Sequence, residues 1–223
     1  MTTRPVWKNT HPLMTACAAG VTLVIGMGSA GGIVGAWSAP EAAAAQATTT
    51  PAMVTVAATT APDYGTWISD VTSVTQQAHT FVEQRTAAAS GEKLAMVLDI
   101  DNTSLATYYK GGYPTPAVPP VLDLAKYART RGVAVFFVTA RPDFLYLPTL
   151  INLTSVGYPV VGLYGRSLPD LFEQVSTFKT EERKEIEAAG YKIIANVGNS
   201  TSDLVGGYAE QTFKLPDYNG LLD

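Results

Sequence analysis

The chain has 223 residues, which is room for one globular domain of ordinary size, and its net charge of −4 with 15% charged residues does not favour a nucleic-acid partner. It contains one cysteine, Cys17, and two histidines, His11 and His79, so a cysteine or histidine nucleophile and a histidine-rich zinc site are not expected. Carboxylates, lysines and hydroxyl groups are left to carry any chemistry.

The first 47 residues have the pattern of a secretory signal. A short basic start precedes the segment from Pro12 to Pro40, which has no charged residue, and a small-residue tract follows with Ala45-Gln46-Ala47 as an A-x-A cleavage site. We therefore predict removal of residues 1–47 and a protein that is secreted or lies in the cell envelope. The alternative is a retained membrane anchor, because the uncharged segment is long enough to span a bilayer.

Two other N-terminal features bear on domain organisation. Gly26–Gly31, GMGSAG, matches the dinucleotide-binding fingerprint, but a proline, an alanine tract and a threonine run follow where a helix and a second strand are needed. The segment is therefore interpreted as part of the signal. Residues 48–62 are rich in Thr, Ala and Pro and carry no charge, which predicts a linker. The globular domain is expected over residues 63–223.

From residue 63 onward, helix and strand patterns alternate. Apolar residues recur near helical spacing over Trp67–Ala88, which predicts an amphipathic helix packed on the domain. Short apolar runs bounded by polar turn residues predict buried strands. The expected strands are Leu94–Leu98, Val133–Val138, Pro159–Tyr164, Lys192–Val197 and Thr212–Leu215.

Helical segments separate these strands. They are expected from Pro120 to Gly132, from Phe144 to Ser155 and over Thr177–Tyr191, the last with Glu181 and Glu182 in its first turn. The alternation predicts an α/β fold with a doubly wound parallel, Rossmann-like sheet and an N-terminal helix. The insert at Thr107–Pro119 is too short for a full capping domain, so only a small cap is expected.

Polar residues follow three of the predicted strands. Asp99 and Asp101 end the first strand, Thr139 ends the second, and the stretch from Asn199 to Asp203 ends the fourth. The carboxyl ends of parallel strands meet at one edge of a sheet, where ligands bind, so these residues are expected to form one site. Asp99 and Asp101 should leave the strand on the same side, and a divalent cation or a shared proton would relieve their repulsion.

These residue types suit phosphoryl transfer. Mg²⁺ prefers oxygen ligands and is suited to a site with one or two carboxylates. The Thr139 hydroxyl and the backbone N–H groups after it can bind a phosphate oxygen. Lys179, near the start of a predicted helix, can balance the negative charge.

The ordered set DIDNT, a strand ending in Thr139, Lys179 and then G-N-xxx-D resembles the haloacid dehalogenase (HAD) superfamily. VFFVTARPD, the Lys179 stretch with Arg183, GYKIIANVGNSTSDL and FKLPDY are similar to its subfamily IIIB, the class B-type secreted acid phosphatases of plants and bacteria. The similarity covers roughly Trp67 to Tyr218.

The resemblance implies an acid phosphatase that hydrolyses small phosphomonoesters. Asp99 would attack phosphorus and form an aspartyl-phosphate, and Asp101 would protonate the leaving alcohol and then activate water. Thr139 and the backbone N–H of Ala140 would hold the phosphoryl group, and Lys179 would neutralise it.

The resemblance also implies a Mg²⁺ site made by Asp99, the backbone carbonyl of Asp101, Asn199 and Asp203. Family members usually have Asp at the position of Asn199, which suggests weaker Mg²⁺ binding here. On this interpretation, Asn199→Asp is expected to tighten the dependence on Mg²⁺.

Several alternatives stay open from the sequence. A non-catalytic storage or binding protein on the same scaffold is the second hypothesis, whereas dehalogenase chemistry is disfavoured because it has no need for Asp101. Arg141 and Arg166 either line the mouth of the site or pair with surface acids. The expected partner is a small phosphorylated substrate, a membrane is expected only if the N-terminal segment is retained, and no oligomeric state is predicted.

Overall fold

The computed structural model describes residues 60–223. The predicted signal, the GMGSAG segment and the linker up to residue 59 lie outside this range. No helix in the described part of the chain has the length and apolar character needed to cross a membrane.

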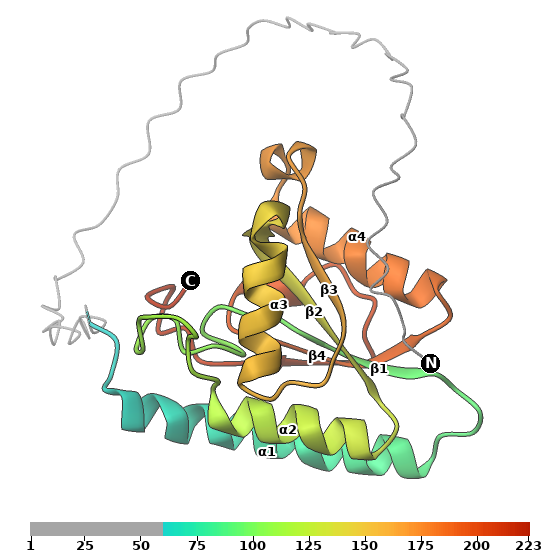
Figure 1. Cartoon of the computed structure of the whole chain (residues 1–223). Helices are drawn as coiled ribbons and strands as arrows, with labels where there is room; N and C mark the ends of the chain where they lie inside the picture. Colours follow the sequence, from blue (N-terminus) through green and yellow to red (C-terminus); the bar gives the residue numbers. More distant parts are fainter. Residues whose placement is uncertain (1–59) are drawn as a thin grey trace, which may run out of the picture. The chain divides into compact units, whose positions relative to one another are not determined.

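A five-stranded parallel sheet forms the centre of the described domain (Figure 1). Its strands lie in the order β3-β2-β1-β4-β5, so β1 is the middle strand. The bounds are β1 Leu94–Leu98, β2 Ala134–Pro142, β3 Val160–Arg166, β4 Lys192–Gly198 and β5 Gln211–Lys214. The prediction of a parallel α/β fold is confirmed.

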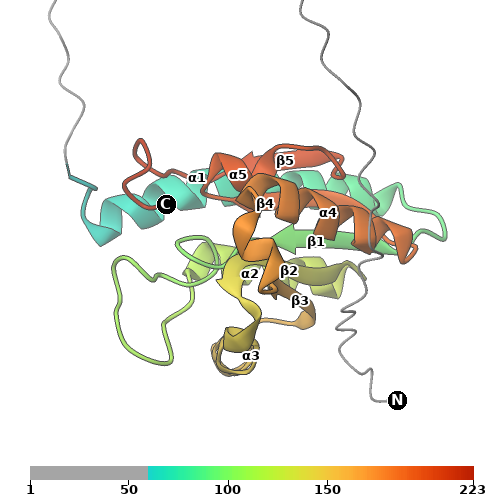
Figure 2. The same ribbon diagram turned by 90° about the horizontal axis from the view of Figure 1, so that it is seen from above.

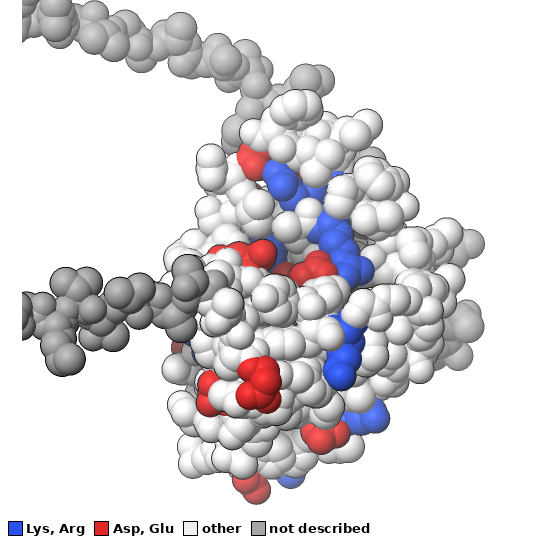
Figure 3. Space-filling view, turned by 90° about the vertical axis from the view of Figure 1, so that its left-hand side faces the viewer, with Lys and Arg blue, Asp and Glu red and all other residues white. Residues whose placement is uncertain are grey.

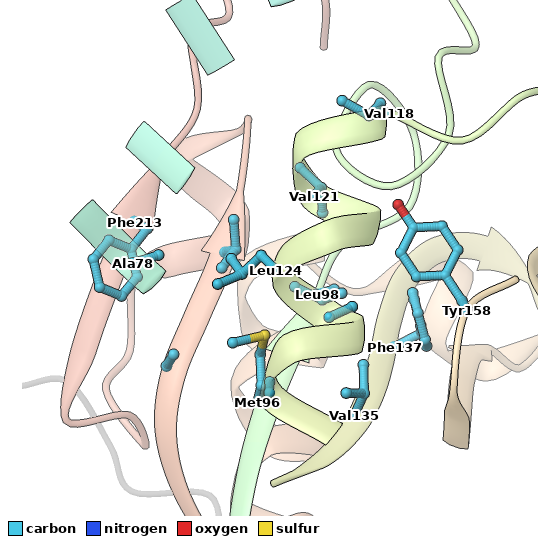
Figure 4. Close-up of a cluster of buried hydrophobic side chains, with 14 of the residues drawn as sticks. Ala78, Met96, Leu98, Val118, Val121, Leu124, Val135, Phe137, Tyr158 and Phe213 are labelled. Atoms are coloured by element: carbon cyan, nitrogen blue, oxygen red, sulfur yellow. The ribbon is translucent and has the colours of Figure 1, made fainter. Parts of the chain in front are cut away.

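Alternate residues of β1 point into two separate hydrophobic cores. Met96 and Leu98 pack into the larger core, where Phe137 of β2 and Leu124 of α2 surround them (Figure 4). Val97 packs into the smaller core on the other face of the sheet. Because both faces are covered, every residue of β1 is apolar and buried, as expected for the central strand of a parallel sheet.

Helices cover both faces of the sheet. Their bounds are α1 Tyr64–Ala87, α2 Pro119–Thr130, α3 Tyr146–Ser155, α4 Val175–Ala188 and the short α5 Thr201–Leu204, with 3₁₀ turns η1 Asp143–Leu145 and η2 Pro169–Phe172. In Figures 1 and 2, α1 and α2 lie side by side on one face and α4 lies on the other. The Asp63 carboxylate caps α1 by accepting hydrogen bonds from the backbone N–H groups of Gly65 and Thr66. After the end of α2, the chain turns at Gly132, which has a φ of 81°.

The start of α4 differs from the prediction. The helix begins at Val175, so Glu181 and Glu182 lie beyond its first turn, and their placement in that turn was wrong. The N-cap residue, Gln174, makes no side-chain hydrogen bond to the helix. The sequence therefore contains no Ser, Thr, Asp or Asn cap that would have marked the start.

The insert between β1 and α2 is a loop held down by side chains from elsewhere. The Asn152 side-chain amide accepts a hydrogen bond from the Thr115 N–H at 2.7 Å and donates one to the Thr115 carbonyl at 2.8 Å. Tyr109 stacks on Trp67 of α1, with ring centroids 4.7 Å apart. Tyr109 is thus a packing residue, whereas Tyr108 and Tyr113 are exposed.

Candidate active site

Charged side chains converge at the carboxyl ends of the strands. In Figure 3, acidic side chains occupy a hollow in the middle of one face, and Lys and Arg side chains border it. Asp99 directly follows β1, and its backbone N–H still bonds to Val197 of β4 at 3.0 Å. The sheet therefore fixes the start of the loop that carries the two predicted catalytic carboxylates.

Lys179 of α4 joins two carboxylates in a buried cluster. Its ammonium lies 2.6 Å from Asp99 Oδ1 and 2.5 Å from Asp203 Oδ1. All three side chains are nearly inaccessible to solvent, with at most 9% of each exposed. The structure brings these three sequence-predicted residues together, although the Asp99–Lys179 bond spans 80 positions of the chain.

The cluster carries more negative than positive charge. One ammonium faces two carboxylates, and the pKa of Lys179 is raised because attraction to Asp99 and Asp203 outweighs the opposing effect of burial. Burial raises the pKa of Asp99 to about 7, against the attraction of Lys179 and with the help of repulsion from Asp203. A second cation beside Asp99 would compensate the remaining charge.

Asp101 lies in a different environment from Asp99. Its side chain is 44% exposed, and both its oxygens accept hydrogen bonds from Arg141, Oδ2 from Nε at 2.9 Å and Oδ1 from Nη2 at 2.7 Å. Arg141 also donates to Thr149 Oγ1 of α3 at 3.2 Å. The two carboxylates therefore differ as the sequence suggested, one buried beside a lysine and one half-open beside an arginine.

Thr139 and Ala140 lie on β2 at the same edge. Thr139 is 2% exposed, and its hydroxyl oxygen accepts a hydrogen bond from the Arg141 backbone N–H at 3.3 Å, whereas Ala140 faces solvent. A small hollow lies next to Thr139, with Arg141 and Tyr146 among its lining residues. Thr139 and Arg141 therefore border an opening at the carboxyl edge of the sheet.

The loop after β4 completes the cluster. Asp203 Oδ2 accepts a hydrogen bond from the Ser200 N–H at 2.8 Å, which forms a capping box at the start of α5. A Cβ at Gly198 would overlap the folded-back Asp203 side chain, so glycine is required there. Asn199 is buried, and its Oδ1 accepts from Thr103 Oγ1 at 2.9 Å.

The donor set fits a divalent cation that prefers oxygen. Among residues 60–223, no hydrogen bond reaches the second carboxylate oxygen of Asp99, and the Asn199 amide oxygen keeps one lone pair. Asp203 is more constrained, because both its oxygens already accept hydrogen bonds. No group of three or more His, Cys, Asp or Glu side chains in the described range forms a ready-made metal site. A cation would therefore need backbone or water ligands in addition.

Two arginines of the site were not assigned a role from the sequence. Arg141 is the partner of Asp101, and its position two residues after Thr139 at a strand end is the signal for this in the sequence. Arg183 is buried and donates to the backbone carbonyls of Asp203 and Gly207 at 2.7 and 3.0 Å. It therefore fixes the loop that carries Asp203.

These features define an α/β protein with a carboxylate–lysine site at the carboxyl edge of its sheet. A family model described as HAD superfamily, subfamily IIIB (acid phosphatase), matches residues 108–221, just over half of the chain. The chain belongs to this subfamily. The matched range begins after Asp99 and Asp101, so the roles of these two residues rest on the site geometry and the DIDNT motif.

Curated relatives from plants match parts of the chain. The chain is 31% identical over 104 residues to Acid phosphatase 1 of Solanum lycopersicum and 26% identical over 125 residues to Vegetative storage protein 1 of Arabidopsis thaliana. These alignments cover 46% and 52% of the chain, but only 41% and 44% of the two relatives. The Stem 28 kDa glycoprotein of Glycine max is 28% identical over 67% of each chain.

A solved structure shares the fold. The class C acid phosphatase of Bacillus anthracis superposes with a TM-score of 0.53 and 20% identity, covering 65% of this chain and 67% of that one. At this identity the similarity supports the α/β architecture and carries no residue-level assignment.

Proposed function

We propose that the protein hydrolyses small phosphomonoesters with Asp99 as the nucleophile. The observation that carries the proposal is the buried Asp99–Lys179–Asp203 cluster, in which Asp99 keeps one carboxylate oxygen without a hydrogen bond among the described residues. Membership of an acid phosphatase subfamily supports the same reaction. Lys179 holds the other oxygen, which orients the carboxylate for attack.

The proposed reaction has two steps. The free oxygen of Asp99 forms a bond to phosphorus while the bond from phosphorus to the leaving oxygen breaks, and Asp101 gives that oxygen a proton. Asp101 then takes a proton from water as the water attacks the aspartyl-phosphate, which releases phosphate and restores Asp99. Thr139 and the N–H of Ala140 hold the phosphoryl oxygens, and Lys179 balances the charge.

Arg141 orients the carboxylate of Asp101. Each oxygen of Asp101 accepts one hydrogen bond from Arg141 and keeps a second lone pair, which can exchange a proton with substrate or water. The half-exposed position of Asp101 gives substrate access to this pair. Arg141 therefore orients the acid/base group between turnovers.

A divalent cation is what this superfamily of phosphatases generally uses, and we propose Mg²⁺. It would supply positive charge that neutralises the phosphate during attack. The residues proposed to hold it are Asp99, Asp101 through its backbone carbonyl, Asn199 and Asp203, with Asp203 sharing oxygens that already accept hydrogen bonds. The uncompensated negative charge of the buried cluster supports this position for the cation.

The open site supports small and varied substrates. The insert is a single loop held by Asn152 rather than a domain that closes over Asp99. We also propose that the protein is exported, on the pattern of the first 47 residues and the plant glycoprotein relatives. A membrane location would follow only from retention of the N-terminal segment.

The second candidate is a non-catalytic storage protein. The match to a protein named Vegetative storage protein 1 favours it, as does Asn199 in place of the usual acid. The presence of both Asp99 and Asp101 favours catalysis.

Hydrolysis of p-nitrophenyl phosphate separates the two candidates. Activity is measured with Mg²⁺ and with a chelator for the wild type, for Asp99→Asn and for Asp123→Asn, which makes the same chemical change on the exposed face of α2. The proposal expects activity in the wild type and Asp123→Asn, and loss in Asp99→Asn. Equal activity in all three proteins would refute the assigned nucleophile, and inactivity of the wild type would support the storage function.

A further inference from the structure

The backbone carbonyl of Leu222 lies between the two loops of the site. It accepts hydrogen bonds from Asn102 Nδ2 at 2.8 Å and from Asn199 Nδ2 at 2.9 Å. Both asparagines are buried, at 6% and 2% exposure. One carbonyl thus joins the loop after β1 to the loop after β4.

Each asparagine also accepts hydrogen bonds through its amide oxygen. Asn102 accepts them from its own loop, and Asn199 accepts one from the loop after β1. Asn102 Oδ1 accepts from the Tyr108 N–H at 2.7 Å and from Thr107 Oγ1 at 3.1 Å. Asn199 Oδ1 accepts from Thr103, whose hydroxyl oxygen in turn accepts from the Asn199 N–H at 3.0 Å. A side-chain amide accepts at its oxygen and donates at its nitrogen, whereas an ionised carboxylate can only accept.

The 217–222 segment is fixed independently of these two bonds. The Leu222 side chain is 1% exposed in the larger core, and the Tyr218 hydroxyl donates to Asp70 of α1 at 2.8 Å. Asp217 pairs with Lys214 at 2.7 Å. In Figure 2 this part of the chain lies beside the first half of α1. The position of the Leu222 carbonyl is therefore fixed by contacts other than its bonds to the two loops.

We infer that the 217–222 segment positions the catalytic loop, with Asn102 and Asn199 as the positioning residues that attach to it. Asn102 directly follows Asp101 and has a φ of 53°, a conformation that asparagine tolerates better than most residues. The inference also accounts for Asn199, because a carboxylate at that position would face the Leu222 carbonyl without a proton to donate. The consequences for turnover rest on the proposed function.

Loss of the attachment is expected to lower kcat rather than raise KM. Thr139 and Lys179, which are proposed to hold the phosphate, lie on β2 and α4 and do not depend on the Leu222 carbonyl. Asp101 is the neighbour of Asn102 and would shift with it. Misplacement of a catalytic group by a fraction of an ångström is expected to reduce kcat about tenfold, with KM changed by less than about twofold.

A double-mutant cycle on the full chain tests the inference. Asn102→Asp keeps the acceptor for Tyr108 and removes the donor to Leu222, and Leu222→Ala loosens the segment that carries the carbonyl. Gln84→Glu is the control, since it makes the same amide-to-carboxylate change at an exposed residue of α1, outside the 217–222 segment and the site loops. Steady-state kcat and KM for p-nitrophenyl phosphate are measured for each protein and for the double variant.

The inference expects a fall in kcat for each single variant, no further fall in the double variant, and wild-type kinetics for Gln84→Glu. Multiplying effects in the double variant would overturn it, as would unchanged kcat in Asn102→Asp. If Leu222→Ala does not fold, the comparison of Asn102→Asp with Gln84→Glu decides alone.

Amide hydrogen exchange provides a readout that does not need activity. The inference expects faster exchange at Tyr108 and Asn199 in Asn102→Asp than in Gln84→Glu. Unchanged exchange would overturn the attachment itself. Faster exchange in Asn102→Asp, together with a wild type that does not hydrolyse p-nitrophenyl phosphate, would keep the attachment and reject the proposed function.

Discussion

Lys179 offers the strongest test of the electrostatics of the site. Lys179→Met removes the ammonium and leaves Asp99 and Asp203 buried beside each other, with at most 9% of either side chain exposed. Breaking a buried ion pair by removing one partner costs about 3–5 kcal/mol, because the remaining charge is desolvated and unpaired. For a domain of this size the expected fall in the unfolding temperature is about 6–20 °C.

The assay is thermal unfolding followed by circular dichroism at pH 7.5, with a chelator present so that a bound cation cannot replace the ammonium. Lys184→Met is the matched control on the same helix. Lys184 pairs with Glu181 at 3.1 Å, but both side chains are about half exposed and screened by water, so its loss is expected to leave the unfolding temperature nearly unchanged. Equal losses in the two variants would refute the reasoning.

The difference should also depend on pH. Burial raises the pKa of Asp99 to about 7, so this carboxyl takes up a proton in the folded protein as the pH falls through neutrality. A neutral carboxyl group no longer needs Lys179. The destabilisation by Lys179→Met is therefore expected to shrink between pH 7.5 and pH 5, and a constant difference would contradict the assigned cause.

Three further predictions concern groups around the site. Arg141→Lys keeps a positive charge but loses the two hydrogen bonds to Asp101, so kcat for p-nitrophenyl phosphate is expected to fall about tenfold. An unchanged kcat would show that Asp101 does not need this partner. Burial and nearby acids raise the pKa of Glu182 from 4.5 to about 7, which makes its charged form unfavourable in the fold and lowers stability as pH rises between these values. In urea unfolding, Glu182→Gln is therefore expected to be more stable than the wild type by about 1–3 kcal/mol at pH 8 and by little at pH 4. A gain in stability of equal size at both pH values would contradict the titration of Glu182. Asn152→Ala removes both hydrogen bonds to Thr115. It is expected to speed proteolysis of the insert loop and to destabilise the domain by about 1–3 kcal/mol. An unchanged cleavage rate would show that other contacts hold the loop.

Much of the fold followed from local patterns in the sequence. The apolar runs ending in Asp99 and Thr139 predicted parallel strands, because only a strand covered on both faces is apolar throughout. Because ligands bind at the carboxyl ends of parallel strands, the sequence also predicted that Asp99, Thr139 and Asp203 lie at one edge of the sheet. The start of α4 was misplaced because Gln174 gives no capping signal.

The hydrogen bonds that shape the site were less accessible from sequence. The pairing of Arg141 with Asp101 depends on how far β2 extends past its apolar run, and the strand continues to Pro142. The bonds from Asn102 and Asn199 end on a backbone carbonyl, and every residue type presents that group in much the same way. No side-chain pattern could have pointed to Leu222.

The central place of β1 also sets the order in which the protein can fold. Its neighbours β2 and β4 come from later parts of the chain, and the bonds from Asp99 to Lys179 and from Asn102 to Leu222 close loops of 80 and 120 residues. Such distant pairings slow folding, because chain entropy is lost before the contacts form. During synthesis, β1 leaves the ribosome as an apolar strand, and the edge that pairs with β4 stays open until β4 is made. The sequence order that buries Asp99 at the end of a central strand thus leaves the same strand open to aggregation while the chain is incomplete.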